Sequence, residues 1–177
     1  EIYITNACDS DLGKIEALSV PFEKVGSGVN TREELLKATY DINKVGVIIL
    51  AAGKGTRMKA PVHKNKVTYK VNGKPLIWYT YNTIKQTGIK NIVVVVGHAK
   101  ESVIKILRKS VVYAEQVKQL GTGDAVKCAL RAMPPYINNV IVMSGDDSAF
   151  YTKELLQSML KSHISSNADL TLLTIEK

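Results

Sequence analysis

A glycine-containing segment at residues 50–58 has the sequence Leu-Ala-Ala-Gly-Lys-Gly-Thr-Arg-Met and directly follows an apolar run. Glycines at positions 53 and 55 would let a phosphate chain approach backbone N–H groups, because no side chain intervenes. The carboxyl end of a strand is also where open α/β sheets bind ligands. The spacing differs from that of a Walker P-loop and lacks the third glycine of the dinucleotide fingerprint. The segment alone therefore fits either a phosphate cradle or a tight turn.

Charged side chains that suit phosphate chemistry stand within and after this segment. Arg57 and Lys66 are cations of the kind that stabilise the negative charge gathering on a transferred phosphoryl group and its leaving pyrophosphate. Asp146 follows an apolar run in a Gly-Asp pair, and a hard cation such as Mg²⁺ takes carboxylate oxygens together with substrate phosphates. Taken singly, the two cations also fit solvated basic side chains, and the Gly-Asp pair also fits a turn.

These motifs occur together in the order and spacing of one enzyme family. The segment at residues 50–58 closely resembles the signature loop of sugar-1-phosphate nucleotidyltransferases, in particular the uridyltransferase domain of bacterial N-acetylglucosamine-1-phosphate uridyltransferases. Lys66 stands ahead of a Gly-Lys-Pro sequence at residues 73–75, Gln116 precedes Gln-Leu-Gly-Thr-Gly at residues 119–123, and Gly145-Asp146 follows a predicted strand. The resemblance covers nearly all of residues 45–177 and implies a Rossmann-like, doubly wound α/β fold with a mostly parallel sheet, either incomplete or circularly permuted.

The resemblance also implies substrates and roles for individual residues. It implies UTP and a sugar 1-phosphate, with N-acetylglucosamine 1-phosphate favoured, as substrates and Mg²⁺ as cofactor. Arg57 and Lys66 would bind phosphates and serve catalysis, and Asp146 and Asn30 would hold the metal. The nucleotide would be bound by nine further residues, with Gln116 at the uracil edge: Leu50, Ala51, Ala52, Gly53, Gly55, Thr56, Gln116, Gly121 and Thr122.

The first 44 residues resemble the end of the same family domain, although here they precede its beginning. Residues 1–6 (Glu-Ile-Tyr-Ile-Thr-Asn) and residues 28–32 (Gly-Val-Asn-Thr-Arg) carry this likeness, and Asn30 matches the asparagine that shares the magnesium ion. Asn30 also fits a residue that merely flanks the Thr31 cap of a helix. A circular permutation, a fused second copy or joined segments would each explain the order. We expect residues 1–44 and 45–177 to form one folded unit.

Several positions depart from the family pattern. Lys64-Asn65-Lys66 replaces Leu-Pro-Lys, which makes Lys64 a rival of Lys66, and Asp124 stands where histidine is usual. Ser144 replaces an aromatic residue, and the region that supplies most sugar contacts has no counterpart. Two alternatives therefore stay open, a cytidylyltransferase or other nucleotidyltransferase and a catalytically inactive nucleotide-binding or regulatory domain. A homo-oligomer or a complementing domain copy is a further expected partner.

The elements that would position these residues alternate between strand and helix from residue 45 onward, which is typical of a parallel sheet. Apolar runs predict strands at residues 45–50, 91–96, 111–114, 139–143 and 169–175. Helices are predicted at residues 75–87, 101–109, 123–132 and 152–162, with Gly88 and Pro134 as stop signals.

The composition of the chain indicates a globular domain with anionic partners. The formal net charge is +8 over 177 residues, but the lysines are scattered and no aromatic residues are interleaved with them, which favours small anionic substrates over nucleic acid. No apolar run approaches the roughly 20 residues of a membrane helix, and the first residues lack the pattern of a signal peptide. We therefore expect a cytoplasmic location, no membrane partner, and free thiols at Cys8 and Cys128.

Overall fold

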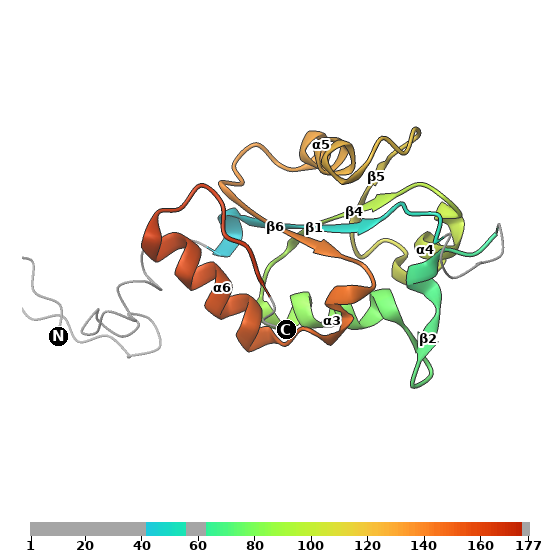
Figure 1. Cartoon of the computed structure of the whole chain (residues 1–177), viewed down its shortest axis with the longest axis horizontal. Helices are drawn as coiled ribbons and strands as arrows, with labels where there is room; N and C mark the ends of the chain where they lie inside the picture. The colour runs from blue at the N-terminus through green and yellow to red at the C-terminus, as the bar shows by residue number, and fades with distance from the viewer. Residues whose placement is uncertain (1–41, 56–62, 175–177) are drawn as a thin grey trace, which may run out of the picture. The chain divides into compact units, whose positions relative to one another are not determined.

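A parallel sheet forms the centre of the computed structural model, which describes residues 42–55 and 63–174. The described residues belong to one compact unit, Thr39–Lys177. The strands are β1 (Val45–Ala51), β4 (Asn91–Val96), β5 (Val112–Glu115) and β6 (Asn139–Ser144). They lie in the order β5-β4-β1-β6, and every neighbouring pair is parallel (Figure 1). The expected α/β class with a mostly parallel sheet is therefore confirmed.

The burial of the central strands explains why the sequence has continuous apolar runs instead of an alternation of apolar and polar residues. Both faces of a parallel sheet are covered by helices, so side chains on both faces of its central strands must be apolar. Residues 45–49 of β1 and residues 92–96 of β4 are all buried. Ile48 of β1 lies opposite Val93 of β4 on one side and Val142 of β6 on the other.

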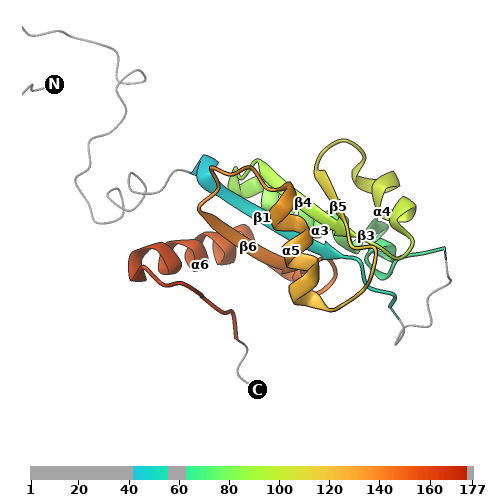
Figure 2. The ribbon, with the colours of Figure 1, turned by 90° about the horizontal axis from the view of Figure 1, so that it is seen from above.

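Helices cover the two faces of the sheet unequally. On one face, α3 (Leu76–Thr87), α4 (Lys100–Leu107) and α6 (Lys153–Ser166) contribute to a large apolar cluster that includes Val47 and Ile49. On the other face, α5 (Thr122–Ala132) packs against a smaller cluster around Ile48. Figure 1 shows α5 above the sheet and α6 below it, and Figure 2, seen from above, shows α5 in front of the strands.

Local signals in the sequence set the helix ends. Pro75 caps α3, and Gly88 ends it with φ +87°, a left-handed conformation that glycine adopts at low cost. The Thr152 hydroxyl accepts a hydrogen bond of 3.2 Å from the Leu155 N–H at the start of α6, which continues to Ser166, four residues beyond its predicted end. No helix in residues 42–55 or 63–174 combines the length and apolar character that crossing a membrane requires.

One predicted strand is wrong in its described part, and several short elements were not predicted. Residues 169–174 form no strand, and Leu170 and Leu172 are 73% and 72% exposed. An apolar run becomes a strand only where another strand can satisfy its backbone groups, and these residues pair with none of the described strands. The unpredicted elements are η1 (Ile42–Lys44), η3 (Lys66–Thr68), η4 (Asp147–Phe150) and the antiparallel pair β2 (Lys70–Val71) and β3 (Lys74–Pro75).

Candidate active site

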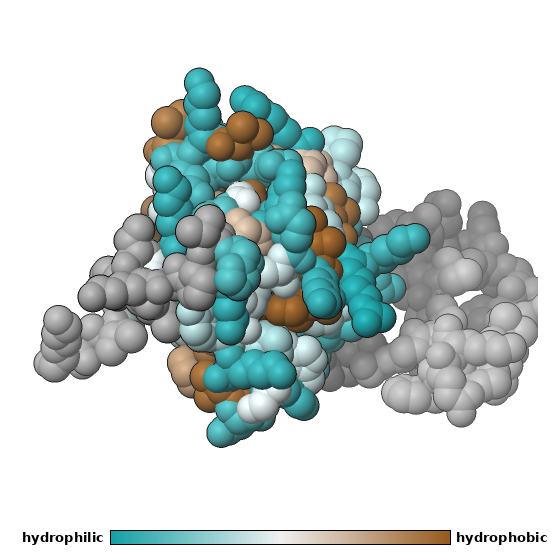
Figure 3. All heavy atoms as spheres, turned by 90° about the vertical axis from the view of Figure 1, so that its right-hand side faces the viewer, coloured by the Kyte–Doolittle hydropathy of each residue, from teal (hydrophilic) through white to brown (hydrophobic). Residues whose placement is uncertain are grey.

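The strand order creates a crevice between the ends of β1 and β6. From β1 the chain moves outward through β4 to β5, and it then returns to the other side of β1 with β6. Ligands bind to open α/β sheets outside the carboxyl ends of the strands, at the point where the strand order reverses. Leu50 of β1 lies opposite Ser144 of β6 at this point. Figure 3 shows the side of the molecule on which these strands end, where hydrophilic side chains predominate and hydrophobic patches lie between them.

A cavity of about 480 Å³ occupies this position. Every described residue that the sequence assigns to the site lines it: Leu50, Ala51, Ala52, Gly53, Gly55, Lys66, Gln116, Gly121, Thr122 and Asp146. Thr56, Arg57 and Asn30 lie outside the described residues, so their roles stay predictions. The lining also includes residues to which the sequence assigned no role, among them Asn65, Gln119 and Ser144.

The glycine segment presents bare backbone to the cavity. A Cβ atom added to Gly53 would meet no atom of the described residues within 4 Å, so packing within this part of the chain does not require glycine at this position. Gly55 has φ +62°, a left-handed conformation that disfavours other residues. Open space over Gly53 is the property that close approach of a phosphate chain or ribose needs.

Asn65 is the buried polar residue that connects this segment to Lys66, and it is only 1% exposed. Its Nδ2 atom donates hydrogen bonds of 2.8 Å to the Ala51 carbonyl at the end of β1 and 2.8 Å to the His98 carbonyl beyond β4. Its Oδ1 atom accepts a hydrogen bond of 3.1 Å from the Val67 N–H and thereby caps η3. An asparagine before a short helical turn is a capping signal that can be recognised in a sequence. The two carbonyl groups that accept hydrogen bonds from its Nδ2 atom, in contrast, are brought together only by the tertiary structure.

Of the two rival lysines, only Lys66 lines the cavity. The Lys64 ammonium group lies 4.3 Å from the centroid of the Tyr69 ring, in a cation–π contact. The helical turn η3, which Asn65 caps, carries Lys66. The structure therefore favours Lys66 as the cation of the site.

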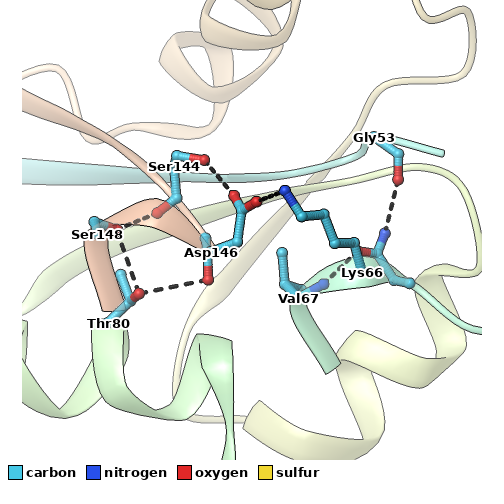
Figure 4. Close-up of polar contacts among 9 residues, drawn as sticks. Gly53, Lys66, Val67, Thr80, Ser144, Asp146 and Ser148 are labelled. Carbon is cyan, nitrogen blue, oxygen red and sulfur yellow. Dashed lines mark hydrogen bonds and ion pairs between the residues drawn. The ribbon is translucent and has the colours of Figure 1, made fainter. Parts of the chain in front are cut away.

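Lys66 and Asp146 form an ion pair in the cavity (Figure 4). The Asp146 side chain is 13% exposed, and its Oδ1 atom accepts a hydrogen bond of 2.5 Å from the Ser144 hydroxyl. Burial alone raises the pKa of Asp146, but the hydrogen bonds from Lys66 and Ser144 and the charge of Lys66 outweigh burial and hold the pKa below its usual value. Asp146 is therefore a carboxylate at neutral pH.

A buried turn holds Asp146 in place. The Gly145 N–H donates a hydrogen bond of 3.0 Å to the Leu50 carbonyl, and a Cβ atom at Gly145 would lie 3.0 Å from that same oxygen. On the other side of the turn, the Ser148 hydroxyl donates to the Ser144 carbonyl and lies 3.3 Å from the Thr80 hydroxyl (Figure 4). The end of β6 is thus fixed both to β1 and to α3.

Two glutamine side chains line the cavity after β5, whereas Asp146 follows β6 at the other edge of the four-stranded sheet. Gln116 is 4% exposed, and its Nε2 atom donates to the Gly121 carbonyl at 3.0 Å and to the Asp124 carboxylate at 2.8 Å. The Gln119 Nε2 atom donates to the Ala52 carbonyl at 2.7 Å, which joins the segment after β5 to the glycine segment. Gln116 and Gln119 are distant from Asp146 in the sequence, but all three residues line the same cavity.

Asp146 is the one acidic side chain among the described residues that line the cavity, and a single carboxylate fits a metal ion that is bound together with a phosphate-bearing substrate. Within residues 42–55 and 63–174, no group of three or more His, Cys, Asp or Glu side chains could hold a metal ion. Mg²⁺ in phosphate-transferring sites is commonly bound by one or two carboxylates, with substrate phosphates and waters completing its shell. Asp146 supplies one such carboxylate at the cavity.

Residues 47–177 match the family model described as the MobA-like NTP transferase domain. In Exiguobacterium sibiricum, a protein named Bifunctional protein GlmU is 42% identical over 127 residues, which is 72% of this chain and 28% of the relative. The protein of the same name in Carboxydothermus hydrogenoformans is 45% identical over 129 residues, covering 72% of this chain and 27% of the relative. The chain therefore spans less than a third of the length of these relatives.

Two solved structures have a similar fold. A nucleotidyl transferase from Methanothermobacter is matched with a TM-score of 0.58 at 20% identity, over 67% of this chain and 57% of that chain. The CTP:phosphocholine cytidylyltransferase LicC from Streptococcus pneumoniae is matched with a TM-score of 0.51 at 28% identity, over 62% of this chain and 50% of that chain.

Proposed function

Because the chain belongs to the family of MobA-like NTP transferase domains, we propose that it transfers a uridylyl group from UTP to a sugar 1-phosphate, releasing pyrophosphate. N-acetylglucosamine 1-phosphate is the favoured acceptor, since the named relatives at 42% and 45% identity are GlmU proteins. The observation that carries the proposal is that one cavity joins the bare backbone at Gly53 to the Lys66–Asp146 pair.

The transfer needs positioning and charge stabilisation more than it needs a base. A phosphate oxygen of the sugar phosphate attacks the α-phosphorus of UTP, the bond from that phosphorus to the bridging oxygen breaks, and pyrophosphate leaves with the electron pair. The attacking group is already an anion, so no side chain has to remove a proton. Lys66 would stabilise the charge that develops on the phosphates, and Arg57 is proposed to assist it.

Asp146, with Asn30 as the proposed second ligand, would hold Mg²⁺, which when bound neutralises phosphate charge and orients the triphosphate. Asp146 and Lys66 contact each other in the cavity. A bound triphosphate would give Lys66 a second anionic partner and would leave the Asp146 carboxylate to bind the metal. The ion pair thus holds both side chains at the place where the triphosphate would bind.

The uracil ring would lie at the far end of the cavity, against Gln116 and the start of α5 at Gly121 and Thr122. Gly53 and the end of β1 would face the ribose and phosphates. This orientation would place the base toward Gln116, which follows β5, and the reacting phosphate toward Asp146, which follows β6 at the other edge of the sheet.

Pyrophosphate release in the presence of Mg²⁺ and N-acetylglucosamine 1-phosphate, measured with each of the four nucleoside triphosphates, tests the proposal. We expect turnover with UTP and its loss in Asp146→Ala. Preferred turnover with CTP would instead support a cytidylyltransferase, an outcome made worth testing by the 28% identity to a CTP-dependent enzyme. UTP binding without turnover in the presence of any acceptor would identify an inactive nucleotide-binding domain. Absence of nucleotide binding would reject both the proposed transferase and the inactive nucleotide-binding domain.

A further inference from the structure

The side-chain amide of Gln116 has only one orientation that its surroundings accept. Its Nε2 group carries two hydrogens, and the structure provides two acceptors for them, the Gly121 carbonyl at 3.0 Å and the Asp124 carboxylate at 2.8 Å. The Oε1 atom has no hydrogen-bond partner among the described residues. Every buried side-chain nitrogen or oxygen atom in that part of the chain has one, so Oε1 is not fully buried, and Gln116 is one of the residues that line the cavity.

The opposite amide orientation would place Oε1 against two other acceptors. In that orientation Oε1 would face both the Asp124 carboxylate and the Gly121 carbonyl, and none of these three oxygen atoms could donate a hydrogen to the others. Buried polar groups without partners are costly, more so beside a charge. Of the two acceptors, only the Asp124 side chain varies with sequence, since the Gly121 carbonyl belongs to the backbone. Asp124 is also a departure from the resembled family, in which histidine is usual at this position.

We propose that Asp124 is a positioning residue that sets the base preference of the cavity by holding the Gln116 Oε1 atom toward the nucleobase, an inference that rests on the proposed function. Oε1 can only accept hydrogen bonds. Uracil carries a hydrogen on its ring nitrogen N3 and can donate to Oε1, whereas N3 of cytosine is itself an acceptor. With Oε1 held opposite N3, the fixed acceptor favours UTP over CTP.

A simpler role for Asp124 is stabilisation of the helix to which it belongs. Asp124 lies in the first turn of α5, where a negative charge interacts favourably with the helix dipole. Removing that interaction lowers the stability of the protein but leaves the ratio between two pyrimidine nucleotides unchanged. The ratio of kcat/KM for UTP to kcat/KM for CTP therefore separates the two roles.

The test is Asp124→Asn, which preserves the shape of the side chain and adds an amide that can donate to Gln116 Oε1. The variant therefore tolerates both orientations of the Gln116 amide. We expect the UTP to CTP ratio of kcat/KM to fall on the order of tenfold, the scale of one unpaired polar group. Asp169→Asn is the matched control, because Asp169 is exposed and does not line the cavity, and we expect it to leave the ratio unchanged.

An unchanged ratio in Asp124→Asn with UTP turnover intact would overturn the role of Asp124 while leaving the proposed function standing. Wild-type protein that neither binds nor turns over UTP would reject the proposed function itself. NMR of the nucleotide-free wild type provides a reading that needs no activity and no variant. Both Gln116 Nε2 hydrogens should show slowed exchange with solvent, and rapid exchange of both would contradict the fixed orientation.

Discussion

The ammonium group of Lys66 meets the carboxylate of Asp146 although the two residues follow different strands of the sheet. Lys66 reaches the cavity from η3, after β1, and Asp146 reaches it from the end of β6. The contact joins the residue predicted to bind phosphate to the residue predicted to bind metal. Substitution of either residue therefore also removes the charged partner of the other.

Replacing Lys66 with methionine should reduce kcat for UTP-dependent transfer by roughly 100-fold to 1,000-fold, as for removal of one group that stabilises transition-state charge. Steady-state pyrophosphate release measures the effect. Lys64→Met is the matched control, since Lys64 packs on Tyr69 and does not line the cavity. Equal losses in the two variants would contradict the choice of Lys66.

The stability of the protein should depend on pH through Asp146. Its pKa is lowered in the folded state, so the unfolded chain binds the proton more readily. The stabilisation is complete above the ordinary aspartate pKa of about 3.9 and is lost as the pH falls through the lower, folded pKa. Unfolding by urea, followed between pH 7 and pH 3 with a chelator present, should show a steeper acid loss for wild type than for Asp146→Asn. Parallel curves would contradict the pKa assignment.

Two glycines at the site should respond differently to alanine. Gly53→Ala adds a Cβ atom that has no neighbour within 4 Å among the residues that the structure describes, so the fold should tolerate it. Nucleotide affinity should fall about tenfold or more, because the methyl group would fill the space in which we propose that the ligand binds. Titration with UTP and thermal unfolding measure the two effects.

Gly145→Ala is the counterpart, because its Cβ atom would come within 3.0 Å of both the Leu50 carbonyl oxygen and a Val67 methyl carbon. We expect a loss of about 1–3 kcal/mol in unfolding free energy from this overpacking. Unchanged UTP affinity in Gly53→Ala, with stability intact, would indicate that the ligand does not approach the backbone at Gly53.

Asn65→Asp should destabilise the protein, because it replaces the donating Nδ2 atom with an oxygen that faces the carbonyls of Ala51 and His98. The expected loss is at least about 1–3 kcal/mol, the cost of a buried polar group left unpaired. Urea unfolding of this variant should be compared with Asn138→Asp, which makes the same change at an exposed side chain. Equal stabilities would contradict the connecting role of Asn65.

The sequence predicted the layered fold well because its strongest signals are local. Fully buried strands gave apolar runs, and the bounds of β4 are those predicted from the sequence. Gly88 and Pro75 marked the ends of α3. The hairpin of β2 and β3 also had a local signal, Asn72-Gly73, whose φ angles of +47° and +79° suit a tight turn, and it was overlooked.

Features that depend on distant residues could not be predicted. The run at residues 169–174 has the composition of a strand, but pairing decides whether it becomes one. The residue types of the site were predictable from motifs, yet the ion pair of Lys66 with Asp146 and the hydrogen bond of Gln116 to Asp124 depend on how the segments meet in space. Roles for Thr56, Arg57 and Asn30 remain predictions.

The buried amide of Asn65 has a thermodynamic consequence for ligand binding. Through its hydrogen bonds to Ala51 and His98, Asn65 fixes the backbone next to Lys66 to the sheet in the folded protein. Ordering a flexible segment upon association costs conformational entropy, which weakens binding. If Lys66 binds phosphate as proposed, the phosphate would restrict mainly the Lys66 side chain, so more of the attraction between the two charges would be retained as affinity.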